Sequence, residues 1–165
     1  MSVSQMKDRP VLDRLLPARI DNQFRGHRAA LWLLGVYVAL KLIMSLNSIF
    51  NTRSIATGAD GLRLDTLPPD GAQALLMLFA LIAIGQLFLT LFALLALVRY
   101  RAMVPLVFAM LLLEQLCRRA LVFDYAVARD GTAVGTYINL GLTAILFVGL
   151  VLSLTGSGDR RVAAT

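Results

Sequence analysis

One apolar run, residues 72–98, constrains the fold of this chain more than any other feature. It holds 27 residues without a single charged side chain. A helix needs about 20 mostly apolar residues to cross the ~30 Å hydrocarbon core of a bilayer. At ~1.5 Å per residue this run would extend ~40 Å, so its helix would tilt or protrude into the headgroups. The run therefore predicts a transmembrane helix.

Two further runs have the length and composition of membrane spans. Residues 29–50 are interrupted only by Lys41, and residues 134–154 contain no charge before a Thr-Gly-Ser-Gly sequence. The whole chain is 58% hydrophobic and 16% charged, whereas soluble domains are about half apolar and a quarter charged. We therefore expect an integral membrane protein that forms a single unit.

The run at residues 102–123 is less apolar than the others. Its first twelve residues are apolar, but Glu114, Gln115, Arg118 and Arg119 follow before the apolar pattern resumes. Twelve apolar residues do not span a bilayer, so this segment can cross only if its polar side faces protein or water. The alternatives are a re-entrant segment and a helix that presents its charges to another protein.

The four runs together predict an all-α integral membrane fold, a bundle of four transmembrane helices. Cytoplasmic loops carry an excess of Lys and Arg. With four spans, one side of the membrane holds ten basic residues, and the other holds three, or five if Arg118 and Arg119 reach it. Both termini are therefore expected in the cytoplasm. The expected divisions are a basic arm at 1–28, a transmembrane domain at 29–154 with an outer loop at 51–71, and a tail at 155–165.

The basic residues gather beside the ends of the expected helices. There each side chain favours anionic lipid headgroups by about 1 kcal/mol, and the expected contacts are made by Arg25, Arg28, Arg99 and Arg101. No basic stripe with interleaved aromatic residues occurs, so nucleic acid is not an expected partner despite the net charge of +6. Arginine outnumbers lysine fourteen to two, which favours a GC-rich bacterial genome and a location in the inner membrane.

The chain lacks the residues that most membrane enzymes use. Paired axial histidines for haem are absent, because the only histidine is His27 at the edge of the first span. Cys117 has no second cysteine and is expected to be a small buried hydrophobe. Asp60, Asp65 and Asp70 lack the spacing of a calcium loop and are interpreted as solvated turn carboxylates. We expect no catalytic residue, no metal and no cofactor.

A group of polar side chains remains at membrane depth, where each central charge costs about 2.5–3.5 kcal/mol and needs a partner. Lys41 and Glu114 each lie twelve residues into parallel helices, so they are expected to form an ion pair. Glu114 and Arg118 share a helical face and could also pair, whereas Arg119 lies about 100° further round. The supporting polar residues are Asn47, Gln86, Gln115 and Asn139.

Two interpretations of this network stay open. In the first, the network fixes helix packing. In the second, it lines a site for a proton, an anion or a small polar substrate. Two guanidinium groups beside one carboxylate leave a net positive charge, which favours an anion. Three functions follow. The first is an accessory or assembly subunit without catalytic activity, which binds other membrane subunits. The second is a small homo-oligomeric transporter or channel, and the third is an enzyme acting on lipids or quinones. The first is favoured, because neither cofactor ligands nor a sizeable soluble domain is present.

Overall fold

The computed structural model describes residues 15–17, 21–124 and 134–155, and this part of the chain forms helices and no strands. Its long helices correspond to the four apolar runs, with bounds that differ from the expected ones by at most three residues. They are α2 (Arg28–Phe50), α4 (Pro69–Arg99), α5 (Val104–Asp124) and α6 (Val134–Leu154).

Three of these helices, α2, α4 and α6, are long and apolar enough to cross a membrane. Helix α4 has 31 residues and begins before its apolar run, since Pro69 occupies the first turn and Asp70 follows it. Proline suits this position because its missing N–H would be unpaired there anyway, and an acidic side chain favours the positive end of the helix dipole. Helix α5 is continuous over 21 residues but does not share the apolar composition of the other three.

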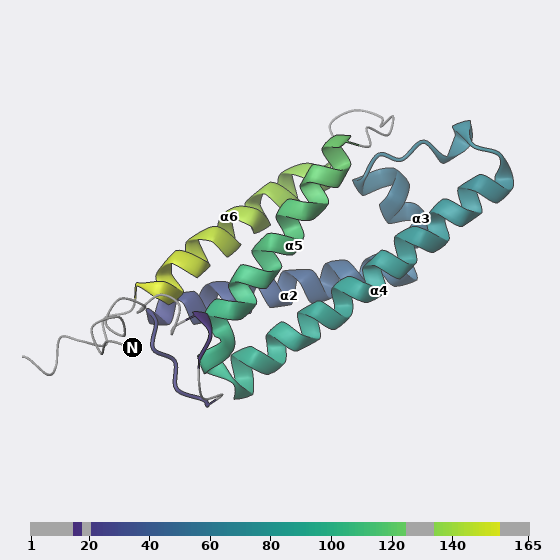
Figure 1. Cartoon of the computed structure of the whole chain (residues 1–165). Coiled ribbons are helices and arrows are strands. Elements are labelled where there is room, and N and C mark those ends of the chain that lie inside the picture. The colour runs from purple at the N-terminus through teal and green to yellow at the C-terminus, as the bar shows by residue number, and fades with distance from the viewer. Residues whose placement is uncertain (1–14, 18–20, 125–133, 156–165) are drawn as a thin grey trace, which may run out of the picture.

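The long helices alternate in direction and pack against antiparallel neighbours (Figure 1). Helix α2 contacts α4 and α6, and α5 contacts α6 and α4, so α2 and α5 lie diagonally across the bundle. Helices α4 and α5 meet at a short connection, η4 (Arg101–Met103), and diverge from there (Figure 1). We call this the hairpin end of the bundle, and the opposite end, which carries the α2–α4 connection, the loop end.

The apolar core lies toward the hairpin end. Its fully buried side chains come from all of the long helices and include Leu34, Tyr37, Phe108 and Leu146. Gly149 allows close packing here, because a Cβ atom at this position would collide with the ring of Phe108. The loop half of the bundle instead buries several polar side chains, Lys41, Ser45, Gln86 and Gln115, at or beside the candidate site described below.

A segment before α2 closes the hairpin end. The backbone N–H of Ala102 donates to the carbonyl of Asp21 (3.2 Å), and the N–H of His27 donates to that of Leu152 (3.1 Å). His27 also caps α2, because its Nδ1 accepts from the N–H of Ala29 at 3.2 Å. The rest of the expected basic arm, residues 1–14 and 18–20, and all of the expected tail except Thr155 lie outside the described residues.

The connection between α2 and α4 folds into short helices over the loop end: α3 (Thr52–Ser54), the π-helix η2 (Ile55–Ala59) and the 3-10 helix η3 (Leu64–Thr66). Gly61 turns the chain with a φ of 66°, which glycine adopts without steric cost. A Cβ atom on Gly135 of α6 would lie 2.6 Å from Oδ1 of Asp60 and 3.1 Å from the carbonyl oxygen of Ala59. The glycine therefore lets this connection rest directly on the start of α6.

Candidate binding cavity at the loop end

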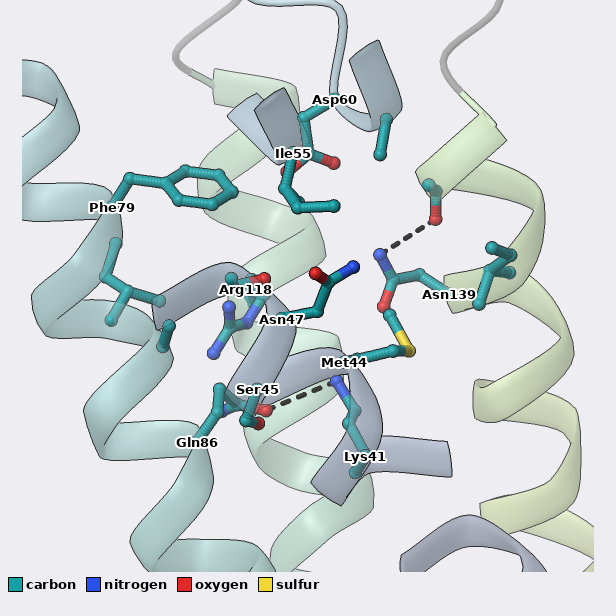
Figure 2. A pocket seen from close by; sticks show the side chains of 16 residues that line it. Lys41, Met44, Ser45, Asn47, Ile55, Asp60, Phe79, Gln86, Arg118 and Asn139 are labelled. Carbon is teal, nitrogen blue, oxygen red and sulfur yellow. Dashed lines mark hydrogen bonds between the residues drawn. The ribbon is translucent and has the colours of Figure 1, made fainter. Parts of the chain in front are cut away.

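A cavity of about 260 Å³ lies at the loop end, enclosed by all the long helices and by η2 (Figure 2). Residues of α2, α4 and α6 form most of its wall, and α5 contributes Arg118. Ile55 and Phe79 give the wall an apolar part close to η2. The polar side chains that line the cavity are Lys41, Ser45, Asn47, Ser48, Asp60, Gln86, Arg118 and Asn139.

A chain of hydrogen bonds connects three helices at the floor of this cavity. Nζ of Lys41 donates to Oε1 of Gln86 at 3.2 Å, and Nε2 of Gln86 donates to Oε1 of Glu114 at 2.9 Å. The same carboxylate oxygen accepts from Nε of Arg118 at 3.0 Å and from its Nη2. The expected Glu114–Arg118 pair is confirmed.

The expected direct ion pair between Lys41 and Glu114 is wrong. Because α2 and α5 lie diagonally across the bundle, the side chain of Gln86 on α4 comes between them. An ammonium group only donates and a carboxylate only accepts, so an amide, which does both, can link them. This chemistry also fixes the orientation of the Gln86 amide. Gln86 is buried, and its backbone carbonyl accepts from Oγ1 of Thr90.

Lys41 is the most deeply buried charge among the described residues. Its exposed fraction is 5%, and Oε1 of Gln86 is the one acceptor that these residues provide for its three N–H groups. Burying a charge without an ionised or fully hydrogen-bonded partner costs several kcal/mol. The ammonium group of Lys41 therefore lines the cavity with unused capacity to donate hydrogen bonds.

A second polar contact joins α5 to α6. Gln115 is 1% exposed, and its Nε2 donates to Oδ1 of Asn139 at 3.2 Å. Asn139 in turn donates from Nδ2 to the carbonyl of Gly135 (Figure 2). Two buried acceptors, Oε2 of Glu114 and Oε1 of Gln115, have no hydrogen-bond donor among the described residues. The hydrogen bond between Gln115 and Asn139 holds α5 and α6 together beside the cavity.

Other candidates from the sequence lie away from the hydrogen-bonded chain. Arg119 is exposed on α5, and no hydrogen bond or ion pair links it to another described side chain. Asn47 accepts from Asn51 at 2.7 Å while it lines the cavity. Cys117 is exposed, so its expected burial is wrong, because it occupies the outward face of α5.

The basic residues expected to contact lipid headgroups all lie at the hairpin end. Arg28 begins α2 and Arg99 ends α4, and both are exposed. Arg25 lies 3.8 Å from a carboxylate oxygen of Asp21. Nε of Arg101 donates to the carbonyl of Leu97. This end of the bundle therefore presents a basic rim.

Sequence reasoning missed Asp60 as a cavity residue. Asp60 is not the solvated turn carboxylate that the sequence predicts, because it is half-buried, lines the cavity (Figure 2) and rests against Gly135. The available signal was apolar residues within the connection, since Ala56 and Leu64 are buried and hold it against the bundle. Ser45, also buried on the cavity wall, gave no signal beyond its one-turn spacing from Lys41.

The described residues contain no group of three His, Cys, Asp or Glu side chains that could hold a metal ion. Comparison with protein families, curated proteins and solved structures returned no match. The function must therefore be argued from the geometry of the cavity itself.

Proposed function

We propose that this chain is a multi-pass membrane protein, with four spans and both termini in the cytoplasm, that binds a small anionic group in the cavity at its loop end. Three spans follow from the composition of α2, α4 and α6. The fourth is α5, which buries Gln115, brings Arg118 to the cavity wall and bonds Glu114 to Gln86 and Arg118. A helix of this composition becomes compatible with the bilayer when its charges pair inside the protein.

The orientation rests on the basic rim of the hairpin end. Arg25, Arg28, Arg99 and Arg101 all lie there, and an excess of such residues is typical of the cytoplasmic side. In a bacterial inner membrane, this orientation puts the hairpin end beside the anionic headgroups of the cytoplasmic leaflet. The cavity then belongs to the outer half of the membrane, below the α2–α4 connection.

The observation that carries the anion site is the buried ammonium group of Lys41. Its described hydrogen-bond partner is a neutral amide, and it shares the cavity with the guanidinium group of Arg118. Oxygen atoms of a phosphate or carboxylate would supply the acceptors that Lys41 lacks, through charge-assisted hydrogen bonds. The carboxylate of Glu114 keeps Arg118 oriented while leaving it at the cavity wall.

Thermal unfolding of the detergent-purified protein with phosphate, acetate or chloride at constant ionic strength tests this site. A ligand at 100 times its Kd stabilises the folded state by about 2.7 kcal/mol, so phosphate should raise the Tm of the wild type. Arg118→Gln should abolish the rise, and Arg119→Gln, the matched control one residue away, should retain it. A Tm that responds equally in both variants would contradict the proposal.

A second candidate is the accessory or assembly subunit, and an exposed face of α5 formed by Leu116, Arg119 and Phe123 favours it. Arg119 lies on that face without a described partner, beside Leu116 and Phe123, which is 86% exposed. A partner helix that offers a carboxylate would cover this charge. Native mass spectrometry of gently solubilised membranes should then show a stoichiometric partner that Arg119→Gln releases, whereas isolated copies of this chain alone would refute the subunit hypothesis.

A further inference from the structure

The side of the cavity between α4 and α5 loses its helix contacts toward the loop end. The bond from Gln86 to Glu114 joins the two helices at the cavity floor. Beyond it, no residue of α4 between 69 and 82 is buried, and none of α5 between 116 and 123. Figure 1 shows the two helices diverging in the same region. The cavity therefore borders a seam between α4 and α5 that faces the surrounding bilayer.

Apolar side chains form the approach to this seam. Ile82, which is 53% exposed, and Phe79 lie on α4 and also line the cavity. Leu121, one turn beyond Arg118, is exposed on α5. Arg118 itself is partly exposed and reaches the cavity from this helix. A molecule that enters here would meet apolar surface first and a guanidinium group afterwards, which suits an amphiphile.

The route from the aqueous side is covered by the α2–α4 connection. Ile55 and Asp60 line the cavity from above its floor (Figure 2). Ala59 also lines it, and Ala59 and Asp60 rest against Gly135. Ala56 within η2 is completely buried. A lipid could enter from the bilayer without moving this packed connection.

The charges of the cavity lie at two levels. Lys41 lies at the floor, deeper in the proposed membrane, and Asp60 lies on the side of the connection (Figure 2). A lipid of the outer leaflet has the same order, because its phosphate is deeper than the group it carries. The volume of about 260 Å³ equals about nine water molecules at ~30 Å³ each, enough for the roughly eight non-hydrogen atoms of a phosphoethanolamine headgroup.

We infer that the bound anion is the phosphodiester of a membrane lipid whose headgroup ends in a primary ammonium. The lipid enters between α4 and α5 past Ile82 and Leu121, its phosphate lies between Lys41 and Arg118, its ammonium faces Asp60, and its acyl chains stay in the bilayer outside the seam. This inference rests on the proposed anion site and adds the source of the anion and its route.

Native mass spectrometry of the purified protein, titrated with lipids of identical acyl chains, tests this assignment. The lipids are phosphatidylethanolamine, phosphatidylglycerol and phosphatidylcholine, and glycerophosphoethanolamine serves as the chain-free probe. Phosphatidylethanolamine should bind about tenfold more tightly than the others, a difference of ~1.4 kcal/mol. Arg118→Gln should abolish the binding, and Arg119→Gln should preserve it. Asp60→Asn should remove the preference over phosphatidylglycerol, and Leu121→Trp, which fills the seam outside the cavity, should weaken lipid binding but not phosphate binding.

The possible failures separate the two proposals. If glycerophosphoethanolamine binds as tightly as the lipid, entry through the seam is wrong and the anion site stands. If phosphatidylglycerol binds equally well and Asp60→Asn changes nothing, the ammonium assignment is wrong. If neither phosphate nor any of these lipids binds to protein with wild-type helix content by circular dichroism, the proposed function itself fails.

Discussion

Replacing Gln86 with leucine should be among the most destabilising single changes at the cavity, although the two side chains are similar in size. The substitution removes the acceptor of Lys41 and one of the donors to Glu114. Hydrogen bonds to charged groups contribute about 1.5–3 kcal/mol each in soluble proteins, and interhelical bonds in membranes average about 0.6 kcal/mol. Two such bonds, one of which leaves a buried ammonium without an acceptor, give an expected loss of about 2–4 kcal/mol.

The assay is unfolding of the purified protein in mixed micelles of increasing SDS content, followed by circular dichroism. Gln73→Leu is the matched control, since Gln73 lies on the same helix and is exposed. It should change the free energy of unfolding by less than about 0.5 kcal/mol. If Gln86→Leu unfolds at the same SDS fraction as this control, the chain from Lys41 to Glu114 does not stabilise the bundle, and the argument from a buried unsatisfied charge is wrong.

Three further predictions concern packing and orientation. Gly149→Ala should destabilise the fold by about 1–3 kcal/mol through its collision with Phe108, whereas Gly141→Ala, at an open position, should be neutral in the same unfolding assay. Gly135→Ala should lift the α2–α4 connection from α6, seen as faster hydrogen exchange of residues 55–60; unchanged protection would contradict the contact with Asp60. In a Cys117→Ala background, a membrane-impermeant thiol reagent should label Thr57→Cys but not Gln23→Cys in intact cells, and the reverse pattern would invert the proposed topology.

The features that the sequence predicts correctly depend mostly on patterns between neighbouring residues. The long helices follow from uninterrupted apolar stretches, and the Glu114–Arg118 pair follows from a spacing of four residues on one helix. Both features depend on neighbours along the chain. The helix bounds were therefore accessible before any information on tertiary structure.

The cavity depended on information that local patterns do not hold. Equal depth of Lys41 and Glu114 suggested a direct pair, but pairing also needs adjacent helices, and α2 and α5 are diagonal. Gln86 lies between them because of the face that α4 turns toward α2 and α5. Asp60 lies at the cavity because Gly135, 75 positions later in the chain, leaves room for the α2–α4 connection. Turn signals in the sequence cannot reveal such a contact between distant residues.

The apolar core of the hairpin end has a consequence for permeability. Tyr37, Phe108 and Leu146 are fully buried there, and Phe108 lies against Gly149 so closely that no side chain fits between them. A hydrated ion that reached the cavity would meet a close-packed barrier of apolar side chains on its way to the opposite face. We therefore expect no conduction through a single copy of this chain, and any conduction would have to run along a boundary between copies.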